Sequence, residues 1–171
     1  MKRIIPSLAL AASLALAFGC APTVSQATDP GYGQNSARQE AADYQRTGFT
    51  TRMEHGRLWV FLPGSEALAA YEKSGELAKH VIRPGKGPGG VTIKAPEGSV
   101  IDAYMLAKPG FITRVEDGRL WVFRAGSPEF KNFTKSGELA KHVIRPGAGP
   151  RGMTLKAPDT ATADAYMAAG N

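Results

Sequence analysis

The sequence predicts an α+β fold in which one ββαββα unit occurs twice in tandem. Residues 48–107 match residues 110–169 at an offset of 62 without a gap, and 38 of these 60 positions are identical, which indicates an internal duplication. In each copy, short runs rich in β-branched and aromatic residues alternate with helix-type segments. A unit of about 60 residues buries only about 60% of its chain's surface and is marginally stable alone. We therefore expect the two units, residues 47–108 and 109–171, to pack together about a pseudo-twofold axis.

The chain begins with a basic pair, Lys2-Arg3, and a mostly apolar stretch, Ile4–Phe18. This layout is typical of a secretory signal peptide and is too short to span a bilayer comfortably. The stretch ends in Ala17-Phe18-Gly19-Cys20, which resembles the lipobox of bacterial lipoproteins, although the family usually has Leu in place of Ala17. The resemblance implies that residues 1–19 are removed, that Cys20 is lipidated and, because Ala21 rather than Asp follows it, that the protein is anchored in the outer membrane.

Ordinary signal cleavage is the alternative, for example after Ala27, and it would discard Cys20. Cys20 is the only cysteine in the chain, which excludes an intramolecular disulfide and any CxxC site. Both kinds of cleavage export the protein to the periplasm. Only cleavage before Cys20 attaches it to the membrane, and then through the lipid alone. Residues 20–46 are rich in small and polar residues, so we expect a flexible linker that holds the body away from the membrane.

The first half of each unit is expected to be a hairpin followed by a helix. In the second copy, the strand-type runs Phe111–Val115 and Leu120–Phe123 flank Glu116-Asp117-Gly118, and an Asp-Gly pair in this position is typical of a tight hairpin. Ser127 then predicts an N-cap, and Gly137 closes the helix as its C′ residue. The first copy keeps the helix pattern at Ser65, Leu68, Tyr71 and Gly75.

The second half repeats this plan. Lys141–Arg145 is expected to be a strand, residues 146–152 a loop and Met153–Lys156 the return strand, after which Asp159 or Thr160 caps a short helix. Together the two units predict an antiparallel sheet of about eight strands, continuous or in two halves, with the helices on one face. The face without helices is the natural place to bind a partner.

The composition and motifs give little support to two broad classes of function, nucleic-acid binding and catalysis. Lys and Arg number 21 against 15 Asp and Glu, a net charge of +6, and loss of Lys2 and Arg3 leaves a mildly basic body, which is not typical of nucleic-acid binding. The body contains no cysteine nucleophile, no Ser–His–Asp motif and no nucleophile elbow, so we expect no enzymatic activity.

The repeated Arg-Leu-Trp-Val-Phe strands carry the principal candidate interface. Strand alternation places Arg57 with Trp59, and Arg119 with Trp121, on one face. Arginine beside tryptophan on an open sheet would recognise acidic or planar groups through cation–π and bidentate contacts. The alternative is that both tryptophans belong to the core. Further basic candidates, placed behind these residues, are Lys79, Arg83, Lys141 and Arg145.

The glycine-rich loops 83–90 and 145–152 suggest anion binding. Free backbone N–H groups, helped by the loop cations Arg83, Lys86, Arg145 and Arg151, would capture carboxylates or phosphates. Because each loop joins two strands rather than a strand and a helix, the helix dipole of a phosphate cradle is missing. The alternative is a wide hairpin loop whose glycines satisfy unusual backbone angles.

His80 and His142 occupy equivalent positions and are the candidate metal ligands. If the two imidazoles met, they would suit copper, nickel or zinc. The alternative is a pair of partly buried structural histidines.

The favoured hypothesis is a non-catalytic binding or scaffolding lipoprotein of the bacterial cell envelope that recognises a protein partner or an anionic envelope polymer. A periplasmic metal carrier using His80 and His142 is the second hypothesis, and an enzyme acting on envelope polymer is the third.

Overall fold

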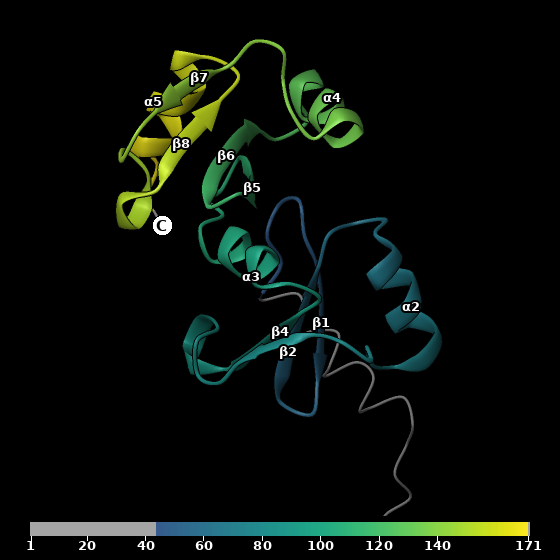
Figure 1. Cartoon of the computed structure of the whole chain (residues 1–171). Coiled ribbons are helices and arrows are strands. Elements are labelled where there is room, and N and C mark those ends of the chain that lie inside the picture. Colours follow the sequence, from purple (N-terminus) through teal and green to yellow (C-terminus); the bar gives the residue numbers. More distant parts are fainter. Residues whose placement is uncertain (1–43, 171) are drawn as a thin grey trace, which may run out of the picture.

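The computed structural model describes residues 44–170 and contains two similar units (Figure 1). The predicted leader, Cys20 and most of the predicted linker lie outside the described residues. The first unit contains β1 (Thr50–Glu54), β2 (Arg57–Phe61), α2 (Glu66–Ser74), β3 (Val81–Arg83), η1 (Pro88–Gly90), β4 (Thr92–Ala95) and α3 (Gly98–Met105). The second contains β5 (Phe111–Glu116), β6 (Arg119–Arg124), α4 (Pro128–Ser136), β7 (Val143–Arg145), η2 (Pro150–Gly152), β8 (Thr154–Ala157) and α5 (Thr160–Ala168). The duplicated α+β fold is confirmed.

The first hairpin of each unit turns on two residues with positive φ. Asp117 and Gly118 have φ angles of 48° and 69°, and the equivalent His55 and Gly56 have 49° and 69°. This combination is typical of the two-residue turn that matches the twist of a hairpin. The turn predicted from Asp117-Gly118 is therefore confirmed, and His55 occupies the same exposed turn in the first unit.

The helix ends also follow the sequence signals. The Ser65 and Ser127 hydroxyls accept hydrogen bonds from the backbone N–H groups three residues later, at 3.2 and 3.3 Å. Gly75 and Gly137 end α2 and α4 in the left-handed conformation, at φ 76° and 75°, where a side chain would be strained. The predicted N-caps and C′ glycines are confirmed.

Each sheet is mixed rather than antiparallel, which corrects the prediction. The strand order is β1-β2-β4-β3 in the first unit and β5-β6-β8-β7 in the second, and β2 pairs with β4 in parallel, as β6 does with β8. The return strand takes the central place because its last three residues are buried, whereas β3 carries the exposed Ile82 and is suited to an edge. Hairpin signals identify the β3–β4 pair but not which of its strands adjoins β2.

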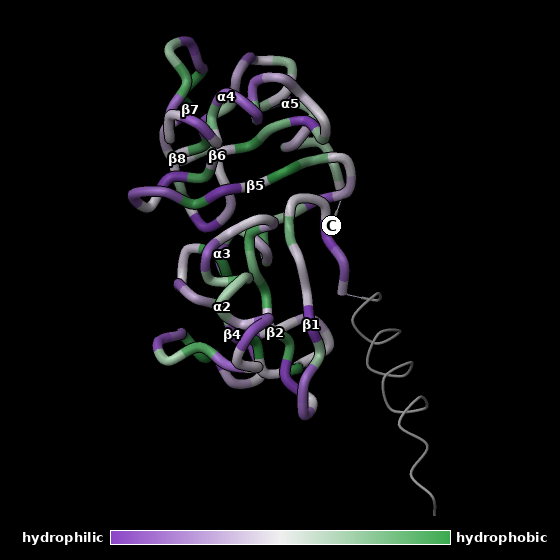
Figure 2. Tube along the Cα trace, turned by 90° about the vertical axis from the view of Figure 1, so that its right-hand side faces the viewer, coloured by the Kyte–Doolittle hydropathy of each residue, from purple (hydrophilic) through white to green (hydrophobic). Residues whose placement is uncertain are grey.

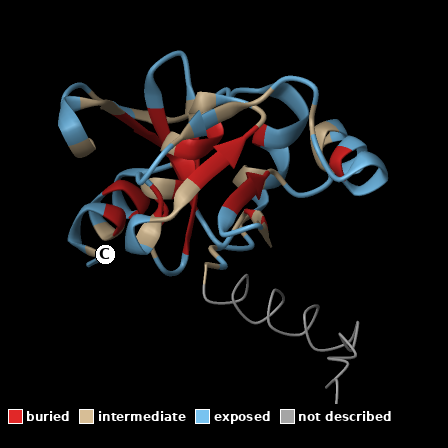
Figure 3. Ribbon diagram, turned by 90° about the horizontal axis from the view of Figure 1, so that it is seen from below, coloured by how far each residue is buried: buried red, intermediate tan, exposed pale blue. Residues whose placement is uncertain are grey.

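Helices cover both faces of each sheet, so the predicted open face does not exist. Trp59 and Phe61 of β2 pack against Tyr71 of α2, while Leu58 and Val60 face α3 on the other side. Figure 3 shows the buried residues concentrated in the strands. Four successive residues of β2 are buried, because alternation sends them into two different cores.

The two units pack head to tail rather than about a pseudo-twofold axis. Helix α3 of the first unit packs against β5 of the second, whereas β1 and α5 make no comparable contact among the described residues. The Thr113 hydroxyl donates to the Ala103 carbonyl at 2.6 Å across this interface. Figure 2 shows α3 between the two units, whose apolar segments lie mainly in the strands. A twofold axis would require the same contact in both directions.

The segment before each first strand binds the end of the unit's last helix. Arg46 Nη1 donates to the carbonyls of Tyr104 and Ala107, at 3.2 and 3.0 Å, and Lys108 Nζ makes the equivalent bonds in the second unit. Tyr44, inside the predicted linker, accepts a hydrogen bond from the Tyr104 hydroxyl through its carbonyl. Folded contacts thus extend back to residue 44. Within residues 44–170, no helix is long and apolar enough to cross a membrane.

Candidate functional site: a cationic pocket between the units

The two tryptophans are core residues, so the predicted exposed arginine–tryptophan face is wrong. Trp59 is 1% exposed and Trp121 is 2% exposed. Arg57 and Arg119 lie at the exposed starts of the same strands and make no cation–π contact with them. The sheet face that strand alternation assigned to solvent is covered by α2 and α4.

A lysine missed by sequence reasoning occupies the tryptophan face instead. Lys94 Nζ lies 4.0 Å from the Trp59 ring centroid and 3.2 Å from Glu76 Oε1, and Lys156 makes the same contacts with Trp121 and Glu138 at 4.2 and 3.0 Å. Both lysines are buried. The hydrogen bond from Lys156 lowers the pKa of Glu138 below its usual value. We call this arrangement of lysine, indole and glutamate the clamp. It holds the segment that follows α2 or α4 against the indole ring. Its sequence signal is a lysine next to buried residues in β4 and β8.

Each histidine belongs to the clamp of its own unit. His80 Nδ1 lies 2.9 Å from the Leu77 carbonyl, and its ring packs against Trp59 with centroids 4.9 Å apart; His142 repeats both contacts at the same distances. No group of three or more His, Cys, Asp or Glu side chains suited to a metal occurs within residues 44–170. The arrangement matches the structural alternative for these histidines.

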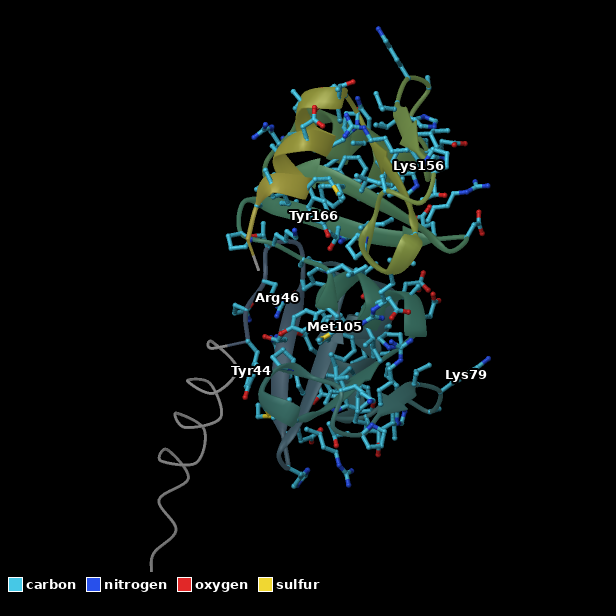
Figure 4. All side chains as sticks on the ribbon, turned by 90° about the vertical axis from the view of Figure 1, so that its left-hand side faces the viewer. Tyr44, Arg46, Lys79, Met105, Lys156 and Tyr166 are labelled. Atoms are coloured by element: carbon cyan, nitrogen blue, oxygen red, sulfur yellow. The ribbon has the colours of Figure 1, made fainter. Side chains whose placement is uncertain are left out.

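The remaining predicted cations fall into two groups. Lys79 and Lys141 are exposed, and Figure 4 shows Lys79 projecting away from the body. Arg83 and Arg145 instead hold the last helix of their units: Arg83 contacts both carboxylate oxygens of Asp102 at 2.6 and 3.0 Å, and Arg145 contacts Asp164 at 2.5 Å. Arg83 also lines a cavity, which is described below.

The glycine-rich loops use their own N–H groups, which corrects the prediction of a bare backbone cradle. The Gly87 N–H donates to the Val91 carbonyl at 2.8 Å and the Gly90 N–H to the Gly87 carbonyl at 3.0 Å; Gly149 and Gly152 repeat these bonds. Each loop is therefore closed on itself as a 3₁₀ turn. These N–H groups are therefore engaged within the loop, and the loop side chains are the stronger candidates for recognising an anion.

Cationic side chains from both loops meet in a cavity of about 340 Å³ at the junction of the units, which we call the junction pocket. It is lined by Arg83, Lys86, Ile101, Asp102, Met105 and Arg151. Arg151, from the second unit, approaches Asp102 of the first to 4.0 Å and is 71% exposed on its side chain. Lys86 forms no ion pair with any described residue. Three cations and one carboxylate thus line the junction pocket.

The Arg83–Asp102 pair fixes one side of this pocket. The hydrogen bonds from Arg83 lower the pKa of Asp102, and those bonds in turn raise the pKa of Arg83, so both groups stay charged near neutral pH. The Asp102 charge is compensated by Arg83. The positive charge of Lys86 and Arg151 remains in excess.

Lys86 and Arg151 are also positions where the duplicated units differ. Lys86 corresponds to Ala148, and Arg151 corresponds to Gly89, so each unit supplies one cation that the other lacks. Arg151 adopts φ 58°, a left-handed conformation that Gly89 adopts freely at φ 64° and that is uncommon for a side-chain-bearing residue. A residue-by-residue comparison of the two copies identifies both positions, but not that they share a pocket.

No family model matches the chain, and no curated protein or solved structure shows significant similarity to it.

Proposed function

We propose that this chain is a non-catalytic binding protein that captures an anionic group of a partner protein or envelope polymer in the junction pocket. The observation that carries the proposal is the convergence of Lys86 and Arg151, two unit-specific cations, on one cavity beside a carboxylate already neutralised by Arg83. If the two loops were only structural, there would be no reason for the two positions at which the units differ to line the same cavity.

The pocket is suited to a group that carries one negative charge next to an apolar part. Met105 supplies the accessible apolar surface, since Ile101 is 0% exposed, and the Arg83 guanidinium is held in place by Asp102. Exposed ion pairs are worth about 0.5–1 kcal/mol each. Lys86 and Arg151 should therefore each strengthen binding of an anion about two- to fivefold at low salt.

The proposed location of this binding protein is the bacterial cell envelope. It is supported by the leader-type segment Lys2–Phe18 and the lipobox-like Cys20, which would attach the protein to the membrane by lipid alone. We expect radioactive palmitate to label the wild-type protein expressed in a bacterial host, and Cys20→Ala to abolish the label. Equal labelling of the two proteins would contradict the anchor.

Two substitutions that exchange residues between the units test the pocket. Lys86→Ala and Arg151→Gly install the residue that the sister unit tolerates at the same position, so the loops should keep their fold. Titration of the purified chain with sodium acetate and with inorganic phosphate, followed by NMR at low ionic strength, should show each variant binding about two- to fivefold more weakly. Lys79→Ala and Lys141→Ala remove the same charge outside the pocket and serve as controls. Equal affinities of wild type, pocket variants and controls would refute the proposal.

A further inference from the structure

A second cavity adjoins the junction pocket at Met105. It measures about 610 Å³ and is lined by Gln45, Arg46, Thr47, Met105, Ala107, Lys108, Pro109 and Gly110. Met105 belongs to the lining of both cavities, and Figure 4 shows it near Arg46 at the junction of the two units. A ligand that extends past Met105 would therefore contact both.

The cations of the second cavity are already engaged. Arg46 Nη1 bonds to two carbonyls at the end of α3, and its guanidinium carbon lies 4.8 Å from the Tyr104 ring centroid. Lys108 Nζ bonds to the carbonyls of Tyr166 and Ala169, at 3.2 and 2.7 Å. Their charge is directed toward helix carbonyls, which carry the negative end of the helix dipole. This cavity is therefore not a second site for a strong anion.

The other groups in the second cavity are neutral and of mixed polarity. Gln45 donates through Nε2 to Thr51, which leaves its Oε1 as an acceptor, and the Thr47 hydroxyl adds a further donor and acceptor. Ala107, Pro109 and Met105 supply apolar surface, and the methionine side chain adapts to irregular shapes. Peptide groups with small side chains have this combination of polarity, whereas an acyl chain would leave the polar groups unpaired.

The surroundings of the junction pocket favour a carboxylate on a peptide over a free phosphate. Asp102 is paired with Arg83, so the anion meets Lys86 and Arg151. A carboxylate matches the planar fork of Arg151. Beyond Met105 the second cavity offers neutral polar and apolar groups, which suit the rest of a peptide and which a free phosphate would not use.

We infer that the two cavities together bind an extended acidic peptide segment of a partner protein, with one Asp or Glu carboxylate between Lys86 and Arg151 and the neighbouring peptide groups past Met105. This inference rests on the proposed function and adds the chemical class of the ligand. The junction of the units is then the recognition site, and neither unit alone contains it.

Short peptides test the inference on the full chain. The probe is the acetylated and amidated peptide Ser-Ala-Glu-Ala-Ser, compared with its Gln counterpart, with acetate and with inorganic phosphate. We expect the Glu peptide to bind at least tenfold more tightly than acetate, and the Gln peptide to lose at least tenfold. Phosphate binding more tightly than the Glu peptide would overturn the assignment to peptides.

One variant separates this inference from the proposed function. Thr47→Trp fills the second cavity without touching the junction pocket, so it should reduce the affinity for the Glu peptide to that for acetate and leave acetate binding unchanged. Thr134→Trp, on the exposed side of α4, is the matched control. If the Glu peptide binds no better than acetate while Lys86→Ala still weakens acetate, the peptide inference fails and the proposed function survives. If Lys86→Ala affects neither ligand, both fail.

Discussion

The two units are most alike around the buried tryptophan. They differ most in the helices α2 and α4 and at the junction between the units. Residues 73–85 and 135–147, which include the glutamate of each clamp, are identical, whereas residues 66–72 and 128–134 differ at every position. The helices α2 and α4 nevertheless occupy the same place, because each keeps its serine cap, its terminal glycine and one buried aromatic residue. The caps and the clamp therefore determine where the helix lies, and most of the helix sequence is free to vary.

One arginine shows how the same position acquires different roles in the two units. Arg52 forms an exposed ion pair with Glu72 at 2.9 Å. The equivalent Arg114 is only 8% exposed and lies between the rings of Phe49 and Phe130, at 5.4 and 4.9 Å, with Thr134 in place of the glutamate. Burial lowers the pKa of Arg114 to about 10. The head-to-tail contact converts a surface position of one unit into an interface position of the other.

The largest expected effect tests whether the two clamps are equivalent. Trp59→Ala and Trp121→Ala should each reduce the free energy of unfolding by about 3–5 kcal/mol, because each removes a large buried side chain together with its cation–π and ring contacts. Urea unfolding followed by far-ultraviolet circular dichroism measures both. Losses that differ by more than about 1 kcal/mol would show that the units depend on their clamps unequally.

A smaller effect is expected at alkaline pH, where the first unit should lose the contribution of Tyr71 to the free energy of unfolding and the second unit has no equivalent group to lose. Burial, and then the hydrogen bond to Glu54, raise the pKa of Tyr71 to about 12, whereas the second unit has Phe133 at this position. A raised pKa in the folded state means that the contribution of Tyr71 is complete below pH 10 and is lost as the pH rises from 10 to 12. Tyr71→Phe removes this pH-dependent term.

The measurement for Tyr71 is a comparison of urea unfolding at pH 8 and pH 11. At pH 8, Tyr71→Phe should be less stable than wild type by about 1 kcal/mol, because the bond to Glu54 is lost. At pH 11 the difference should shrink or reverse, while Tyr104 and Tyr166, whose pKa values are also raised by burial, destabilise both proteins alike. If wild type and Tyr71→Phe differed in free energy of unfolding by the same amount at both pH values, the raised pKa of Tyr71 would be contradicted.

Local features of the fold were predictable from the sequence, and features that depend on packing were not. The Asp117-Gly118 turn and the Ser127 cap depend on neighbours a few residues away, so their signals are complete in the sequence. The parallel pairing of β2 with β4 and the helices on opposite faces depend on contacts far apart in the chain. Strand alternation placed Trp59 on a face correctly but does not say that a helix covers that face.

The same distinction applies to the candidate site. The loop cations Arg83, Lys86 and Arg151 were recognisable as candidates because they accompany glycines in repeated loops. That Lys86 and Arg151 line one pocket follows from the packing of α3 against β5, which brings loops from different units together. The sequence offers equivalent loop cations, Arg83 and Arg145, in both units, whereas the head-to-tail junction brings side chains of both loops to one asymmetric pocket.

The smallest expected effect concerns the N-caps of α3 and α5, which differ by one methylene group. Asp159 accepts the Thr162 backbone N–H at 2.7 Å, but the equivalent Glu97 accepts no backbone N–H of α3, because its longer side chain is a poor N-cap; it accepts from the Ser99 hydroxyl at 3.2 Å instead. Glu97→Asp should therefore stabilise the protein by about 0.5–1 kcal/mol, and Asp159→Glu should destabilise it by a similar amount. Because the Asp159 carboxylate also accepts from the Thr162 hydroxyl, and Val100 stands at that position in the first unit, the gain should be smaller than the loss. Urea unfolding of the two variants measures both changes, and destabilisation by Glu97→Asp would show that the N-cap preference of Asp159 does not transfer to the first unit.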